Sequence, residues 1–532
     1  MNKSRYILLS VCLLVLSQAG LHAQTYERVF RNNLWNGTDN ITGIRQDSVS
    51  RSYAEIYGNI KGGEFRDTWE AEDGWSAGAA TASIRHLEKI SLAGSFSFRQ
   101  TEGYGMCGSM FINPGYYPVD ALEFTPGRKT LQTYGFDGGI SYDASEHWRI
   151  GASMDFESAN MAKRKDLRHT NWSLDMKIAP GLMYHSGDFA VGAAAIFRKT
   201  SETVDPEQVG TAESSYYAFL DKGLMYGVHS VWTGSGLHLD ESGVNGFPVK
   251  EFSYGGSVQM QYKGFLADVE YLRTSGNVGE KEYEWFRFPG NSISADLAYR
   301  TDGRERFHII RLGLLMKERT MSESVLEKVT SNGITTVHNH GWNRIYAGRT
   351  WSLAPEYEYI SDRFEARVNA EIRQENSVSS QIYPYIFTRS LLTWEARGEV
   401  LFRGAGRFDI GLKAGYGAGA AEEEERMASG SSGVQTSPYR LQEWYDRHME
   451  YETAQRMSLG LSLRWNFWKG LYAEAEGSWL HAFNLRHISG PNRYNAGLAI
   501  GVTFKRFLRH CEEGRSPDVA IRKSIMRNKT KT

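Results

Sequence analysis

Hydrophobic and polar residues alternate with a period of two along much of this chain. Residues 134–142 place aromatic and aliphatic side chains at every second position, with glycine, aspartate and serine between them. After a short turn, residues 148–156 repeat the pattern. Because successive side chains of a strand point to opposite faces, each segment predicts a strand with one apolar and one polar face.

The same pattern recurs to the end of the chain, in pairs of segments joined by short turns. These turns are expected near residues 86–88, 144–146, 186–188, 263–264, 302–304, 361–362, 404–406 and 469–470. The opposite strand ends carry longer polar segments, at about 101–131, 159–170, 200–249, 275–290, 318–343, 375–386, 419–452 and 483–490. Short turns on one side and long loops on the other are typical of outer-membrane barrels, in which the short turns are periplasmic.

The predicted fold is therefore all-β: a single transmembrane antiparallel β-barrel over residues 51–504. The pattern gives about 18 strands, or 14 to 16 if the outermost ones are misassigned. Outward aromatic residues lie at strand ends, as in the aromatic girdles of such barrels. The pairs are Tyr134 with Tyr142, Phe408 with Tyr416, and Tyr494 with Phe504. A soluble sandwich would explain the alternation but not this aromatic spacing.

Both termini differ from the barrel region. Residues 1–23 have a charged start, a short apolar stretch and a small-residue region, which together predict an export signal. Residues 24–50 do not alternate, and they are expected to form a periplasmic segment, a plug inside the barrel or a disordered leader. The last strand ends at Phe504 and resembles the signal that the outer-membrane assembly machinery recognises. Residues 505–532 then form a basic tail, which is expected to be disordered and to be a reading-frame extension. A tail that binds DNA or an anionic surface is the alternative.

Composition narrows the class further. Hydrophobic residues make up 41% of the 532 residues, and past the N-terminus no apolar run approaches the ~20 residues of a spanning helix. A formal net charge of −1 gives no electrostatic case for nucleic acid. Of the three cysteines, Cys12 lies in the export signal, which leaves Cys107 and Cys511 and no disulfide framework.

Charged residues of both signs occupy the face that should line the lumen. The set is Glu365, Arg367, Glu371, Arg373, Glu395, Arg397 and Glu399. These side chains predict either a water-filled conduit with a weak ion preference or a salt-bridged interior that conducts nothing. The sequence leaves both open, because a barrel of this size holds a channel only when loops do not plug it.

Two loops stand out from the rest. Residues 106–129 form an apolar, aromatic and proline-containing segment, and its candidate functional residues are Phe111, Tyr116, Tyr117, Phe124 and Arg128. We expect this loop to fold inward and constrict the pore, with an outward patch for a partner as the alternative. A basic loop, with Lys163, Arg164, Lys165 and Arg168, is expected beside it. Its candidate roles are contact with lipopolysaccharide phosphates or with the constriction loop, and plain solvation is the alternative.

No catalytic, cofactor or metal residues are predicted. The chain has no nucleophile elbow, P-loop or zinc-protease motif. Regular alternation explains the paired carboxylates Glu395 with Glu399 and Glu474 with Glu476. His338 and His340, near Glu323 and Glu327, lack fixed partners and give only a weak metal signal.

The loop sequences at residues 107–128 (CGSMFINPGYYPVDALEFTPGR) and 162–171 (AKRKDLRHTN) resemble those of domain-of-unknown-function family 6850, a family of outer-membrane barrels. The resemblance extends from about Asn33 to Phe504 and implies the same fold and export route, but no activity. The function expected is a pore or gated channel for a small solute. The alternatives are a surface binding, assembly or secretion-associated barrel and, last, a barrel-wall enzyme. The expected partners are outer-membrane lipid and lipopolysaccharide, the assembly machinery and another envelope protein.

Overall fold

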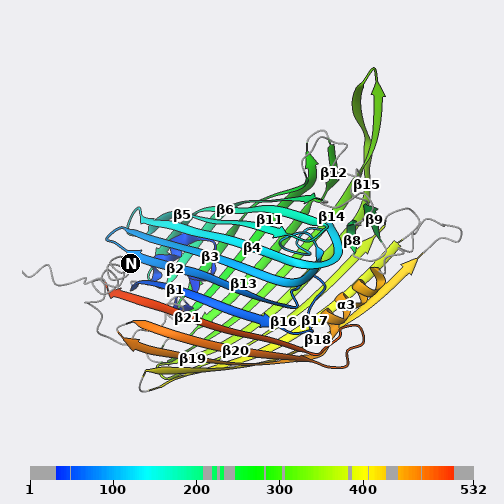
Figure 1. The fold of residues 1–532 in the computed structure, drawn as a ribbon. Coiled ribbons are helices and arrows are strands. Elements are labelled where there is room, and N and C mark those ends of the chain that lie inside the picture. Colours follow the sequence, from blue (N-terminus) through cyan, green and yellow to red (C-terminus); the bar gives the residue numbers. More distant parts are fainter. Residues whose placement is uncertain are drawn as a thin grey trace, which may run out of the picture.

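Eighteen antiparallel strands close into one ring in the computed structural model (Figure 1). The structure describes residues 31–47, 49–207, 218–224, 228–232, 246–280, 283–301, 303, 306–380, 386–404, 407–426, 441–468 and 470–507. The ring consists of β1 (Val49–Gly62), β2 (Asp73–His86), β3 (Ile90–Ser109), β4 (Asp120–Asp143), β5 (Trp148–Lys163), β6 (Arg168–Ser186), β7 (Phe189–Glu207), β10 (Phe247–Tyr262), β11 (Phe265–Glu280), β13 (Gly290–Arg300), β14 (Arg306–Ser331), β15 (Ile334–Ser361), β16 (Phe364–Ser379), β17 (Ile386–Arg403), β18 (Phe408–Arg426), β19 (Arg456–Trp468), β20 (Leu471–Ala482) and β21 (Asn492–Phe507).

The first and last strands close the ring. Strand β1 pairs with β2 on one side and with β21 on the other, where Val49 lies opposite Phe507 and Gly62 opposite Tyr494. Closure leaves no unpaired sheet edge, which is the condition for a β-structure to cross a bilayer. The expected closed antiparallel barrel of about 18 strands is confirmed.

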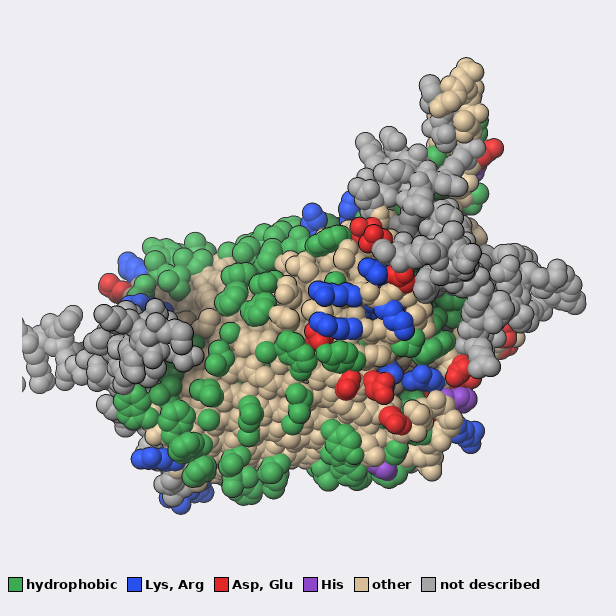
Figure 2. Space-filling model, viewed as in Figure 1, with side chains coloured by type: hydrophobic (Ala, Val, Ile, Leu, Met, Phe, Trp, Pro, Cys, Tyr) green, Lys and Arg blue, Asp and Glu red, His purple; other side chains and the backbone are tan. Residues whose placement is uncertain are grey.

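The outer face of the ring is apolar. Large side chains that alternation assigns to this face are exposed, for example Trp172 at 53%, Leu461 at 55% and Leu498 at 69%. Figure 2 shows hydrophobic side chains spread over the flank of the barrel. Such a surface is stable only against hydrocarbon, so the molecule is an integral outer-membrane barrel. Among the described residues, no helix is both long and apolar enough to cross a membrane.

Several segments expected as loops are regular structure. Residues 318–343 form the outer part of a long hairpin, in which β14 runs to Ser331 and β15 starts at Ile334. Within 419–452, β18 continues to Arg426 and helix α3 (Leu441–Thr453) follows. The barrel strands begin at Val49 and end at Phe507, slightly outside the expected limits of 51 and 504. Strand ends beyond the membrane no longer contact hydrocarbon, so they lack the alternation on which the sequence boundaries rested.

Further short elements lie at the long-loop end of the barrel. Strands β8 (Ala218–Leu224) and β9 (Val228–Trp232) pair with each other, and β8 also pairs with the start of β4. Strand β12 (Tyr283–Arg287) bridges β11 and β14. At the short-turn end, the 3-10 helices η1 (Leu34–Gly37) and η2 (Ile41–Gln46) contribute no strand to the ring. The expected export signal (1–23), its following residues to 30 and the tail from 508 lie outside the described residues.

Candidate functional site: the barrel lumen and its two closures

The N-terminal segment, residues 33–47, lies inside the ring near the short turns. Asn33 and Asn40 cap η1 and η2, each accepting a hydrogen bond from the backbone N–H two residues later. The Trp35 side chain is 2% exposed and donates its indole N–H to Gln261 on the wall. Around it is a buried cluster of wall and segment side chains: Leu34, Met183, Ala190, Leu266, Ala298, Phe307, Ile309 and Ile360.

Polar contacts fix the register of this segment against the wall. The Asn40 amide donates to Gln259 Oε1 at 3.0 Å and to the Leu182 carbonyl at 3.0 Å. Glycines on the wall make the approach possible, because a Cβ on Gly181 or Gly192 would come within 2.6 Å of the Asn40 side chain. The segment is therefore seated in a groove that these lumen-facing glycines leave open.

A cavity of about 1020 Å³ lies between the N-terminal segment and the rest of the wall. Among the described residues, nine carboxylates and four cationic side chains line it. The carboxylates are Glu55, Asp137, Asp155, Glu358, Glu365, Glu399, Asp409, Glu474 and Glu476, and the cations are Arg31, Arg367, Lys413 and Arg464. The cavity thus has an excess of five formal negative charges.

The charges are not evenly distributed around the cavity. On β15 and β16, Glu358 and Glu365 both bind Arg31, at 3.1 and 3.2 Å, so the cation that directly precedes the N-terminal segment is held by two wall carboxylates. Arg403 also binds Glu365, at 2.5 Å. Across the cavity, the carboxylates of Glu55 and Asp137 accept hydrogen bonds from hydroxyl groups, at 2.7 and 2.6 Å.

Most of the other expected lumen charges are paired along or across strands. Arg367 binds Glu356 and, at 3.2 Å, Glu358. Arg397 binds Glu395 at 2.6 Å, and Lys413 lies 3.8 Å from Glu399. Arg373 pairs with Glu375, and Glu371 lies opposite Glu395 in the register of β16 and β17. The lumen is therefore both charged and partly salt-bridged. The part of the cavity wall around Glu55 and Asp137 is called here the open side of the cavity.

At the long-loop end, a second closure fills the barrel mouth. It is an apolar cluster, called here the mouth cluster, in which the constriction loop packs against the inner faces of several strands and against β8 and β12. Its buried members are Met110, Phe111, Tyr117, Val119, Ala121, Leu167, Val204, Ala218, Leu220, Phe247, Val249, Val278, Trp285, Phe286, Phe288, Met321 and Ile345. Phe111 and Tyr117 are 3% and 6% exposed, and their ring centroids lie 5.4 Å apart.

The remaining candidate residues of the constriction loop make specific contacts. The Tyr116 hydroxyl donates to Glu251 Oε1 at 3.0 Å, and its carbonyl accepts from Arg319 at 2.8 Å. Phe124 stacks on Trp444 of α3, with ring centroids 4.9 Å apart. Arg128 is half-exposed and binds Glu102 at 2.7 Å.

The basic loop lies beside the constriction loop. Lys163 is fully buried and forms an ion pair with buried Glu123, and it also donates to the Thr125 carbonyl at 2.7 Å. The Arg164 backbone N–H donates to the Arg128 carbonyl at 3.5 Å, while the Arg164 and Lys165 side chains are exposed. Arg168 binds Asp166 at 2.8 Å. Contact of this loop with lipopolysaccharide phosphates stays a prediction.

Helix α3 completes the closure of the mouth, and the sequence analysis missed it. Leu441, Tyr445 and Met449 are buried at a spacing of four residues, against side chains of β4, β8 and β17. That spacing was a readable helix signal within 419–452. On the adjoining flank of the helix, His448 Nδ1 lies 3.0 Å from Asp67 Oδ2. Burial opposes the charged imidazole, but the Asp67 and Glu452 carboxylates outweigh it and raise the pKa of His448.

The sequence of the barrel region matches a known protein family. A model of the family of unknown function DUF6850 matches residues 41–504, which include η2 and most of every ring strand. The chain belongs to the DUF6850 family. The resemblance seen in residues 107–128 and 162–171 is thereby confirmed. No curated protein matches this DUF6850 chain.

Solved structures similar to this DUF6850 barrel include outer-membrane receptors and transporters. The ferric preacinetobactin receptor of Acinetobacter baumannii has a TM-score of 0.37 at 7% identity, over 86% of this chain and 80% of that one. A mutant of the ferric enterobactin receptor of Pseudomonas aeruginosa has 0.40 at 9%, over 86% and 81%. The outer membrane transporter YddB of Escherichia coli has 0.41 at 8%, over 85% and 80%.

The histidines with a weak metal signal lie on the long hairpin of the DUF6850 barrel. His340 Nε2 lies 2.6 Å from Glu327, and both side chains are more than half exposed. Glu323 instead binds Lys222 at 2.7 Å. The group of three potential ligands found among the described residues is a different one, Asp67 with His448 and Glu452.

Proposed function

We propose that the barrel is a gated pore for small solutes with a preference for cations. The observation that carries this proposal is the acidic cavity within the lumen. Its volume of about 1020 Å³ is at the upper end of the range of small-molecule sites. A salt-bridged interior that conducts nothing would not need a cavity of this size.

Charge supports the cation preference. Nine carboxylates against four cations create a negative potential inside a low-dielectric wall, which concentrates cations and repels anions. The carboxylates on the open side are the relevant ones, since those of β15 and β16 are already neutralised by arginines. Asp137 on β4 and Glu476 on β20 belong to the open side.

The N-terminal segment supports gating. It adds no strand to the ring, so it can leave the wall without breaking the ladder of backbone hydrogen bonds. Its displacement would join the cavity to the short-turn end of the barrel. A gate of this kind is an element with two positions beside a rigid wall.

Charge selectivity in a planar bilayer tests the proposal. The purified barrel should show stepwise conductance, with a reversal potential in a KCl gradient that indicates cation preference. The double variant Asp137→Asn with Glu476→Gln removes two lumen charges while keeping hydrogen-bonding groups, so the reversal potential should move toward zero. Glu424→Gln, at an exposed site near the end of β18, is the matched control and should leave it unchanged. A barrel that stays silent, or a shift equally large in the control, would contradict the pore.

No catalytic role is included in this proposal. The carboxylates that could be paired for acid–base chemistry have cationic neighbours. Glu395 is bound by Arg397 at 2.6 Å and Glu474 by Arg464 at 2.7 Å. Each of these carboxylates is thus part of an ion pair of the barrel wall.

A second candidate function, a surface barrel that binds another envelope protein, is favoured by the β14–β15 hairpin. This hairpin extends well past the other strands (Figure 1). It carries exposed Val325 and Val329, at 51% and 40%. Under this alternative, a chain lacking residues 323–342 would lose a partner that co-purifies with the intact barrel in stoichiometric amount. If the partner co-purifies equally with both chains, or if no partner co-purifies with either the intact or the shortened chain, the pore would be favoured.

A further inference from the structure

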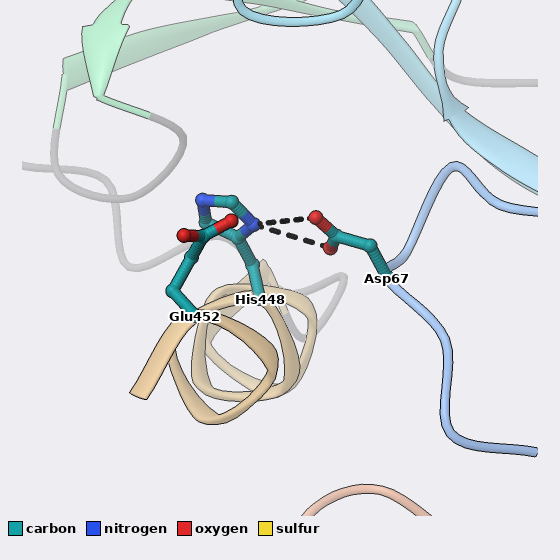
Figure 3. Close-up of side chains that lie close together, drawn as sticks. All are labelled: Asp67, His448 and Glu452. Atoms are coloured by element: carbon teal, nitrogen blue, oxygen red, sulfur yellow. Dashed lines mark hydrogen bonds and ion pairs between the residues drawn. The ribbon is translucent and has the colours of Figure 1, made fainter. Parts of the chain in front are cut away.

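Asp67, His448 and Glu452 come together at the barrel mouth, and none of the three lines the cavity of the lumen. Asp67 lies in the loop that joins β1 to β2, and the other two residues lie on α3, between β18 and β19. One potential ligand atom from each side chain lies within 4.8 Å of the others. Figure 3 shows the imidazole and the Glu452 carboxylate on one side of the helix, with Asp67 reaching toward them from the loop.

The geometry is close to that of a metal site. His448 Nδ1 lies 3.1 and 3.0 Å from the two Asp67 oxygens. In a tetrahedral zinc site with bonds of 2.0–2.1 Å, neighbouring ligand atoms are about 3.3 Å apart. A small widening of the present contact would therefore admit an ion.

The loop and helix hold these groups in place without help from an ion. Asp67 is 2% exposed, and its Oδ1 accepts the Thr68 backbone N–H at 2.6 Å. The Trp69 ring lies against His448, with centroids 4.8 Å apart, and Phe65 stacks on Tyr451 at 5.2 Å. Two ring contacts and a fixed carboxylate thus preorganise the site, which reduces the cost of binding.

A simple ion pair between Asp67 and His448 does not account for Glu452. This residue follows His448 by four positions, so both project from the same face of α3. Two ligands at this spacing on one helix, completed by a third from another segment, recur in metal sites. One imidazole nitrogen and two carboxylate oxygens suit a divalent transition-metal ion, with water in the remaining positions.

We propose that Asp67, His448 and Glu452 bind a divalent transition-metal ion such as Zn²⁺, which clamps α3 to the β1–β2 loop. The adjoining flank of α3 packs into the mouth through Tyr445 and Met449. An ion held between helix and loop therefore stabilises the closed mouth. This inference goes beyond the proposed pore and requires no conductance, so the bilayer experiment and the metal experiment can fail independently.

Metal titration of the full-length barrel in detergent micelles, after removal of metals with a chelator, tests the site. Zn²⁺ should bind at a single saturable site, and Co²⁺ at the same site should give the visible absorption of a low-coordinate nitrogen and oxygen environment. Loss of an outer-shell partner typically weakens metal binding 10–100-fold, so loss of a direct ligand should cost at least about 100-fold. Glu452→Gln is the decisive variant, because it leaves the His448–Asp67 contact and the packing of α3 intact.

Two controls separate a specific site from general effects of charge. His487→Gln removes a half-exposed histidine outside α3, whose Nδ1 lies 3.9 Å from Asp446 of that helix. This variant should leave Zn²⁺ affinity unchanged. Glu443→Gln removes a carboxylate from the first turn of α3 and should also have no effect. Absence of saturable Zn²⁺ binding, or a Glu452→Gln variant that binds as tightly as the unaltered chain, would overturn the site.

Hydrogen exchange tests the clamp itself. Zn²⁺ should slow exchange of the α3 backbone amides in the unaltered barrel and not in Glu452→Gln. Binding without any change in α3 exchange would overturn the clamp.

Discussion

Replacing Trp35 by alanine should release the N-terminal segment from the lumen wall. The Trp35 side chain is 2% exposed, lies within the cluster of Met183, Ile309 and Ile360, and donates its indole N–H to Gln261. Truncation of a buried tryptophan to alanine costs about 3–5 kcal/mol. Because each 1.4 kcal/mol is tenfold in an equilibrium, the ratio of released to seated segment should rise roughly 10²–10⁴-fold.

The barrel itself should tolerate this change. Residues 33–47 contribute no strand, and the 18 ring strands keep all their backbone pairings when the segment leaves. The lost energy therefore appears as local release and not as global unfolding. The folded barrel should still migrate as a compact species on unheated gels.

Hydrogen exchange of residues 33–47 in detergent micelles measures the release. Exchange should accelerate in Trp35→Ala and stay slow in Trp148→Ala, which removes the same side chain from the lipid face, where Trp148 is 48% exposed. If the segment is also the gate, Trp35→Ala should raise the open probability in a bilayer. Exchange as slow as in the unaltered chain would refute the reasoning, because it would mean that Trp35 does not hold the segment.

Two further predictions concern the mouth and the lipid face. Lys163→Met leaves the buried carboxylate of Glu123 without its cationic partner and should destabilise the constriction loop by about 3–5 kcal/mol. Faster proteolysis at residues 106–129 would detect this loss, and adding Glu123→Leu should restore much of the resistance. Leu461→Arg places a charge in hydrocarbon at a cost of about 2–4 kcal/mol and should lower the folded fraction in bilayers, whereas Glu399→Arg in the lumen should not. Equal folding of the two variants, or unchanged proteolysis of Lys163→Met, would contradict the assignment of these positions.

The transmembrane part of the fold could be predicted from sequence because lipid imposes a simple rule. Every second residue must be apolar where a strand contacts hydrocarbon, so Trp172, Ile178 and Leu182 on β6 could be assigned to the outer face. The structure exposes them at 53%, 39% and 46%. The short turns followed from the same pattern, since alternation stops wherever the chain leaves the membrane.

The rule fails where strands leave the membrane. Polar residues predominate in the outer part of the β14–β15 hairpin and do not alternate regularly with apolar ones, so its pairing of Thr330 with Thr335 had no clear signature. Helix α3 did carry a signal, the apolar spacing of Leu441, Tyr445 and Met449, but a Gly- and Ser-rich stretch precedes it and the whole region was assigned as loop.

Contacts between distant segments were not accessible at all. Asp67 and His448 are separated by 381 positions and meet only because closure of the ring brings the β1–β2 loop beside α3. The seat of the N-terminal segment is equally non-local, since it depends on Asn40 fitting against Gly181 and Gly192. A glycine in a strand is compatible with several roles, and the sequence alone does not say what approaches it.

The two closures of the lumen differ in strength, and this difference indicates where a gate should open. The mouth cluster buries 17 described side chains, with Met110, Phe286 and Phe288 at 0% exposure, and α3 adds a second cluster beside it. The N-terminal segment buries three apolar side chains of its own, Leu34, Trp35 and Ile44. Counted with its wall contacts, the cluster around the segment has nine buried side chains against the 17 of the mouth cluster, so at about 1.5–3 kcal/mol for each fully buried side chain release of the segment costs less than opening the mouth. Opening should therefore begin at the short-turn end, and a solute bound in the cavity would need only a rearrangement of the segment to exchange with that side.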